Sequence, residues 1–207
     1  LVDSYNASGR PLISGVRNRV PEDVQLRLLF EYFRPEKMGV VNDPSELNST
    51  LNTNSLRAIS EELSFELVEH VYELDDAGEI SLDQIPLALA HLKQRGADAI
   101  YVGSSSFNLE HREAFVKAAN ALGLPVFSAY TQMVKDAGAL MAIGTSYANV
   151  GCLAAVQAEQ VVLNGAIPGE LRIKSLNRYS VILNMKTARE LSLYPPLSLL
   201  TVAEIVR

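Results

Sequence analysis

Three short polar segments hold the side chains best suited to bind a small molecule. Carboxylates in segment 42–49 can pair with a ligand ammonium group, because charge-assisted hydrogen bonds are the strong ones. Hydroxyls in segment 103–108 can contact a polar ligand, and an aromatic ring in segment 128–133 can cover a ligand face. The candidate binding residues in these segments are Asp43, Ser45, Glu46, Asn48, Ser104, Ser105, Ser106 and Tyr130.

Each segment also has a purely structural interpretation. Asn48 or Ser49 can cap a following helix, and Asn108 can do the same for the next one. The three serines are ordinary turn residues, and Tyr130 can be a half-buried tyrosine of the usual kind. The residue types alone leave the binding and structural alternatives open.

Motifs for catalysis or metal binding are missing from the sequence. Segment 103–106 reads G-S-S-S, without the glycine spacing of a nucleophile elbow or the Lys of a phosphate-binding loop. The histidines, His70, His91 and His111, follow no metal-binding spacing, and only His111 lies near a candidate segment. The single cysteine, Cys152, excludes an intramolecular disulfide, and we expect a buried, inert thiol. We therefore predict no catalytic residue, no metal and no cofactor.

Strand-like and helix-like segments alternate along the chain, joined by short turns. We expect strands at 38–41, 65–72, 97–102, 124–127, 138–143 and 180–184, with helices between them, including one at 147–163. This alternation predicts an α/β fold with a parallel sheet covered on both faces. Ligands of such sheets bind beyond the carboxyl ends of the strands, which is where the three polar segments lie.

Composition narrows the possible partners of the 207-residue chain. Its 18 Lys and Arg against 24 Asp and Glu give a formal net charge of −6, so we expect no nucleic-acid partner. No apolar run approaches the ~20 residues that a membrane-spanning helix needs. Hydrophobic residues make up 48% of the chain, which is enough for an ordinary folded core.

Six stretches together resemble one family. They read D-P-S-E-L-N-S at 43–49, A-D-A-I-Y-V at 97–102, G-L-P-V-F at 123–127, V-K-D-A-G-A-L at 134–140, G-T-S-Y at 144–147 followed by Gly151, and V-I-L-N-M-K-T-A at 181–188. In order and spacing they are similar to the substrate-binding family of ABC transporters that includes tryptophan- and tyrosine-binding lipoproteins. The resemblance covers residues 9–196.

The resemblance implies a type I periplasmic-binding-protein fold, with two α/β lobes that close on a small ligand. It places the end of lobe 1 and a hinge crossing at 1–16, lobe 2 at 17–137, a return crossing and a lobe 1 helix at 138–179, and a return to lobe 2 at 180–207. The chain would then be the second lobe plus part of the first. Ser146 and Tyr147 join the candidate ligand-binding residues through the 144–147 motif.

The function that the resemblance implies is that of a solute-binding component of an ABC importer. It would bind a small polar or amino-acid-like ligand in an interlobe cleft, without catalysis, and would partner an ABC transporter permease. The expected location is periplasmic or otherwise extracytoplasmic, with membrane anchoring left open. The family pattern has carboxylates where this chain has Ser104–Ser106 and Ser146, so Asp43 or Glu46 would have to compensate. An extracytoplasmic sensor domain of a signalling receptor is the main alternative, and an α/β enzyme is a weaker one.

Overall fold

The computed structural model describes residues 4–176 and 178–207, which form two compact units. The smaller unit combines Leu1–Val20 with Gly144–Ser180, and the larger unit combines Pro21–Ile143 with Val181–Arg207. Each unit is therefore built from two separate stretches of the chain.

The larger unit is organised around a seven-stranded sheet. Its strands are β2 (Lys37–Asn42), β3 (Glu66–Val71), β4 (Ala99–Val102), β5 (Val126–Ser128), β6 (Met141–Gly144), β8 (Ser180–Asn184) and β9 (Glu204–Val206), in the spatial order β3-β2-β4-β5-β6-β8-β9. The pairs β2–β3, β2–β4, β4–β5, β5–β6 and β8–β9 are parallel. The predicted α/β class with a parallel sheet is confirmed.

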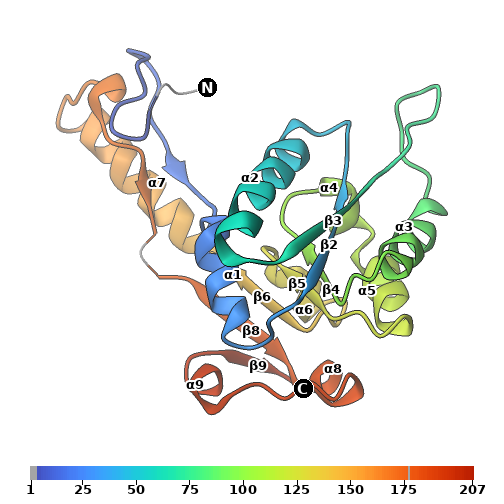
Figure 1. Ribbon diagram of the computed structural model, residues 1–207. Helices are drawn as coiled ribbons and strands as arrows, with labels where there is room; N and C mark the ends of the chain where they lie inside the picture. The colour runs from blue at the N-terminus through green and yellow to red at the C-terminus, as the bar shows by residue number, and fades with distance from the viewer. Residues whose placement is uncertain (1–3, 177) are drawn as a thin grey trace. The chain divides into compact units, whose positions relative to one another are not determined.

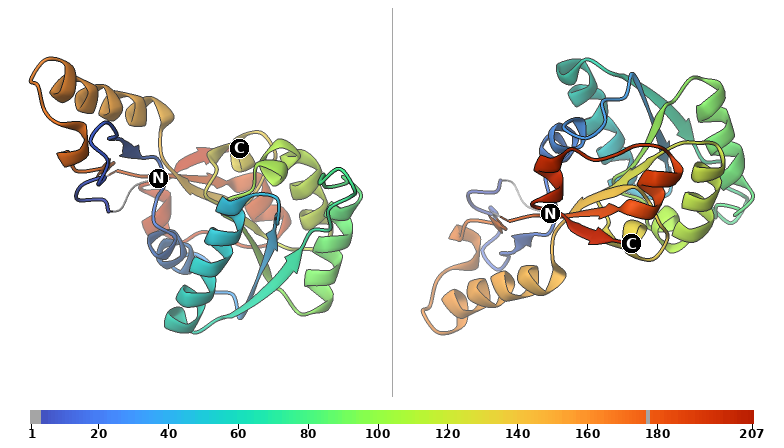
Figure 2. Two further views of the ribbon diagram at one scale, coloured as in Figure 1. Left: turned by 90° about the horizontal axis from the view of Figure 1, so that it is seen from above. Right: turned by 90° about the horizontal axis from the view of Figure 1, so that it is seen from below.

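Helices cover both faces of this sheet (Figure 1 and Figure 2). Helices α1 (Glu22–Phe30) and α2 (Leu47–Leu63) pack together on one face, and α3 (Gln84–Gln94) and α5 (Arg112–Ala121) pack together on the other. The shorter helices of this unit are α4 (Ser106–Glu110), α6 (Thr131–Lys135), α8 (Met185–Glu190) and α9 (Leu197–Leu200).

The alternation of side chains along a strand distributes the core between the two faces. Ile100 and Val102 of β4 join the apolar cluster under α3 and α5, whereas Tyr101 points to the side of α1. Gly39 of β2 allows close packing on the α3 face, because a Cβ there would lie 2.7 Å from Ile100 Cδ1.

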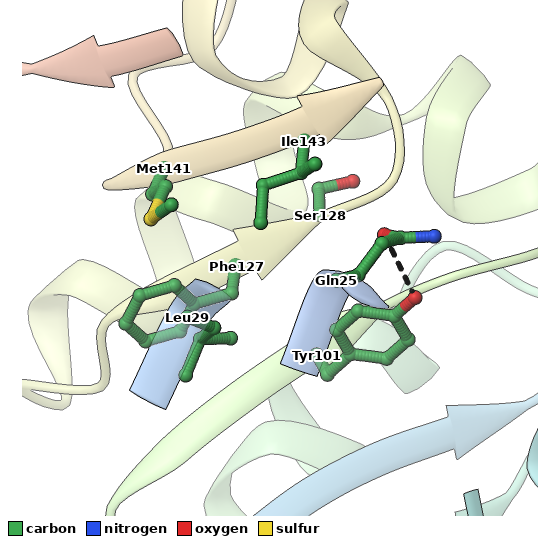
Figure 3. Close-up of a pocket in the computed structure, with 7 residues that line it drawn as sticks. All are labelled: Gln25, Leu29, Tyr101, Phe127, Ser128, Met141 and Ile143. Atoms are coloured by element: carbon green, nitrogen blue, oxygen red, sulfur yellow. Dashed lines mark hydrogen bonds between the residues drawn. The ribbon is translucent and has the colours of Figure 1, made fainter. Parts of the chain in front are cut away.

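A small cavity lies between α1 and the sheet (Figure 3). Gln25 and Leu29 of α1 line it together with Tyr101, Phe127, Ser128, Met141 and Ile143 from the strands. The Tyr101 hydroxyl donates to Gln25 Oε1 at 3.1 Å, and the volume of about 10 Å³ is that of a single water position. This α1 cavity is part of the core rather than a place for a solute.

The smaller unit is dominated by α7 (Tyr147–Val162), which confirms the helix expected at 147–163. It also contains a parallel two-stranded ribbon of β1 (Val16–Arg17) and β7 (Lys174–Ser175), and the 3-10 turn η1 (Pro168–Glu170). Gln157 of α7 is buried and donates from Nε2 to Arg172 O at 2.7 Å. Cys152 is exposed on α7, so the expected buried thiol is wrong: the helix turns that side to solvent.

The caps predicted at Asn48 or Ser49 and at Asn108 are wrong, because each helix begins earlier in the chain than these residues. Helix α2 begins at Leu47, before Asn48 and Ser49, and Ser49 Oγ instead accepts from Asp43 N at 2.9 Å. Helix α4 is capped by Ser105, whose Oγ accepts from Asn108 N at 3.1 Å, and Asn108 is buried within that helix. Within 4–176 and 178–207, none of the helices has the length and apolar character needed to cross a membrane.

Candidate functional site

An open groove with a volume of about 650 Å³ lies at the carboxyl ends of β2, β3 and β4. It is lined by residues that follow those three strands: Asp43, Ser45, Glu46, Gly78, Glu79, Ile80, Ser106, Phe107, Glu110 and His111. Along the chain, β3 is added on one side of β2 and β4 on the other, so the groove borders the switch point of the sheet. Parallel α/β sheets bind their ligands at this position.

The turn after β2 is fixed by a network around Asp43. The Asp43 side chain is buried, and its Oδ1 accepts from Ser45 N at 2.9 Å and from Ser45 Oγ at 2.6 Å. Such an Asx-type turn is a common use of aspartate after a strand. Part of the hydrogen-bonding capacity of this carboxylate is therefore used to shape the loop.

Glu46 joins the loop after β2 to the start of α4. Its Oε2 accepts from Ser106 N at 2.7 Å, and its Oε1 accepts from Ser106 Oγ at 3.3 Å. An acidic side chain at this place satisfies a backbone N–H that the helix itself leaves unpaired. Glu46 thus holds the two walls of the groove together.

Aromatic rings form one side of the groove. The Phe107 ring lies 4.7 Å from the His111 ring and 5.3 Å from the Tyr72 ring, measured between centroids. The Tyr72 hydroxyl donates to Asn108 Oδ1 at 2.8 Å, and burial followed by the nearby Asp43 charge raises the pKa of Tyr72 above its ordinary value. Tyr72 therefore stays a neutral hydrogen-bond donor that anchors α4 to the end of β3.

The charge of the groove is strongly one-sided. Asp43, Glu46, Glu79 and Glu110 contribute four carboxylates, and no Lys or Arg belongs to the lining. Glu79 and Glu110 are exposed, and neither carboxylate has a side-chain partner in the part of the chain that the structure describes. A concave site lined by one sign of charge concentrates ligands of the opposite sign, so the groove favours a ligand with a positive group.

The ten predicted binding residues divide into three sets. Asp43, Ser45, Glu46 and Ser106 line the groove. Four others belong to the same unit but not to the lining. Asn48 is exposed in the first turn of α2, and Ser104 is half-buried. Ser105 is the buried cap of α4, and Tyr130 is half-buried against the core. Ser146 caps α7, accepting from Asn149 N at 3.4 Å, and Tyr147 is exposed, both in the smaller unit.

Six of the ten lining residues, Phe107 among them, were not in the predicted binding set. Gly78, Glu79 and Ile80 come from the loop after β3, and Glu110 lies near the end of α4. The loop after β3 is as polar as the other segments and also follows a strand, so the same rule about carboxyl ends would have selected it. His111, the one histidine near a candidate segment, also lines the groove. Among the residues that the structure describes, no group of three or more His, Cys, Asp or Glu side chains gathers in a way that could hold a metal ion.

Solved structures share this fold across the whole chain. A conserved domain protein from Vibrio cholerae is 23% identical with a TM-score of 0.82, and the match covers 100% of this chain and 67% of that one. A Streptococcus pneumonia ABC domain solved in complex with L-Trp is 22% identical with a TM-score of 0.80, over 100% and 68% of the two chains. The fold is that of the type I periplasmic-binding proteins.

A curated relative and a family description complete the comparison. A tyrosine-binding protein from Clostridioides difficile is 25% identical over 182 residues, which are 87% of this chain and 50% of the relative. This chain therefore spans about half the length of that curated relative. Residues 1–207 match the family described as ABC transporter substrate binding protein. The chain belongs to the ABC transporter substrate-binding protein family.

Proposed function

We propose that this chain is the solute-binding component of an ABC importer, and that its ligand is a small molecule carrying a positively charged amino group. The observation that carries the proposal is the acidic groove at the switch point of the parallel sheet. The groove combines carboxylates with the Phe107 and His111 rings, a set that suits an ammonium group on an apolar or aromatic body.

The comparisons support an amino-acid-like ligand. The curated relative is named a tyrosine-binding protein, and one structural neighbour was solved with L-Trp. This chain has Ser104–Ser106 and Ser146 where the family pattern has carboxylates, so a ligand ammonium needs another partner. Glu79 and Glu110 supply it, because they are open to solvent while Asp43 and Glu46 also hold the loops.

In the whole receptor, both lobes would take part in binding. The smaller unit represents part of the first lobe, and Ser146 and Tyr147 would contribute from there once the lobes enclose the ligand. The loaded receptor would deliver its ligand to an ABC transporter permease outside the cytoplasm. The protein acts by binding alone, so the ligand should be recovered chemically unchanged after release.

Isothermal titration calorimetry with the full chain tests the ligand class. L-Tyr, L-Trp and L-Lys represent ligands with an ammonium group, and ribose and succinate represent neutral and anionic solutes. The chain has no tryptophan, so fluorescence excited at the indole band reports L-Trp itself. We expect saturable binding of at least one amino acid and none of succinate, because four carboxylates repel an anion.

Charge-neutralising variants locate the site. The double variant Glu79→Gln and Glu110→Gln should weaken amino-acid binding about tenfold, by loss of two charge-assisted contacts. Glu61→Gln is the matched control, since Glu61 is an exposed glutamate on α2 outside the groove. If the double variant binds like the control, the groove is not the binding site; if succinate binds better than every amino acid, the ligand class is wrong.

A further inference from the structure

Two histidines meet on the face of the sheet that α3 covers, away from the groove lining. His70 lies on β3, the strand at the edge of the sheet, and His91 lies in the last turn of α3. Their Nδ1 atoms are 2.9 Å apart and their ring centroids 5.1 Å apart. His70 is half-buried and His91 is exposed, so water and dissolved ions reach the pair.

The distance between the two nitrogens fits a shared metal ion as well as a hydrogen bond. Imidazole nitrogens bind first-row divalent metals at about 2.0–2.1 Å. Two nitrogens 2.9 Å apart that are both at that distance from one ion subtend an angle of about 90° at the ion. This is the angle between neighbouring ligands in square-planar and octahedral complexes, which Cu²⁺ and Ni²⁺ prefer, rather than the wider angle of tetrahedral Zn²⁺.

We propose that His70 and His91 form a binding site for one Cu²⁺ or Ni²⁺ ion, held by both Nδ1 atoms with solvent completing the coordination. The proposal does not depend on the function assigned to the groove. The bound ion would tie the end of α3 to the edge strand β3, replacing a single hydrogen bond with two coordinate bonds.

Two charged side chains act on the His70 ring in opposite directions. The Glu73 carboxylate acts in favour of a cation there, and the Arg95 guanidinium acts against it. Arg95 is held by donating from Nη1 to Glu69 O at 2.7 Å, on the backbone of β3.

Titration of the full chain with CuCl₂ and NiCl₂ tests the site, followed by calorimetry and by electron paramagnetic resonance of the Cu²⁺ form. We expect one Cu²⁺ per chain with splitting from two equivalent nitrogens, and binding in the order Cu²⁺ above Ni²⁺. At a hundredfold excess over the dissociation constant, the melting temperature should rise by about 5 °C or more.

Single substitutions decide whether the two histidines are the ligands. His91→Gln and His70→Gln should each weaken Cu²⁺ binding about tenfold or more and abolish the two-nitrogen signal. His111→Gln is the matched control and should bind like the unaltered chain. His91 is exposed, so His91→Gln keeps the test valid even if His70→Gln folds poorly, which circular dichroism would reveal. Cu²⁺ binding that His91→Gln leaves unchanged, or that His111→Gln weakens equally, would overturn the proposal.

Discussion

The groove and the α1 cavity are both hollows of the same unit, yet they use their polar groups in opposite ways. In the α1 cavity, Gln25 and Tyr101 bond to each other and leave space for about one water. In the groove, Asp43 and Glu46 form hydrogen bonds within and between the loops, while Glu79 and Glu110 remain exposed to solvent.

The difference indicates that the residues that stabilise this unit and the residues that bind a ligand lie at different places around the same sheet. The α1 cavity is formed by residues within helix and strand, where close packing leaves little room. The groove is formed by loops at the carboxyl ends of the strands, where side chains can change without exposing the core. Substitutions in the two places should therefore have different effects, and four experiments test this.

The largest effect is expected from removing an aromatic ring from the α1 cavity, compared with removing one from the groove. Phe127 is 1% exposed and stacks on Phe33 at 6.0 Å, so Phe127→Ala should lower the free energy of unfolding by about 3–5 kcal/mol. Phe107→Ala, in the half-buried groove wall, should cost about 1–2 kcal/mol and instead impair ligand binding. Urea unfolding measures both, and equal losses of stability would remove the distinction between the hollows.

A smaller effect is expected at Gly103, which links the strand of the cavity to the loop of the groove. A Cβ at this position would lie 2.2 Å from Asn52 Oδ1 and 2.5 Å from Tyr101 Cε1. Gly103→Ala should therefore cost about 1–3 kcal/mol. In contrast, Gly151→Ala on α7 meets no atom within 4 Å and should be neutral or slightly stabilising. Thermal unfolding of the two variants side by side measures the contrast, and a neutral Gly103→Ala would show that Asn52 moves aside freely.

Glu46 tests whether a groove residue also contributes to stability. Glu46→Ala leaves Ser106 N without its acceptor and should cost about 1 kcal/mol. Glu46→Gln keeps an oxygen that can accept the same hydrogen bond, so it should retain most of the stability and lose only the charge. Chemical denaturation separates the two outcomes; equal losses in both variants would assign the effect to charge rather than to the hydrogen bond.

The smallest effect is expected at a surface ion pair that lines neither hollow. Arg27 of α1 pairs with Glu62 of α2, and their side chains are 53% and 59% exposed. Such pairs contribute little in water, so Arg27→Ala should change the free energy of unfolding by less than about 0.5 kcal/mol. A loss above that range, measured by urea unfolding, would mean that the packing of α1 on α2 depends on this contact.

The elements of the fold were predictable because each has a local signature. A buried apolar run bounded by turn residues marked β2, the expected strand 65–72 matched β3 to within two residues, and the family motif at 181–188 marked β8 and the start of α8. The caps expected at asparagines were wrong even though the observed caps are local: Ser105 Oγ and Ser146 Oγ each accept from a backbone N–H three residues later. Asn108 is engaged by the Tyr72 hydroxyl, which lies 36 positions away in the sequence.

The site was predictable to the extent that one rule about strand ends could be applied. That rule selected Asp43, Glu46 and Ser106, and it could have selected Glu79. The contact between His70 and His91 has no sequence signature, since the two residues are 21 positions apart on different elements. Only the packing of α3 on β3 brings them together.

The division of the larger unit between two stretches of the chain has a consequence for its synthesis. Strand β6 neighbours β8 in the sheet, and Asn184 N of β8 donates to Leu140 O, just before β6, at 3.0 Å. Residues 144–180 of the smaller unit are made between the two strands. Until the ribosome has released β8, β6 is an open edge whose apolar residues have no partner strand on one side. Unpaired apolar edges attract other chains, so β6 is an aggregation-prone edge of the chain until β8 is in place.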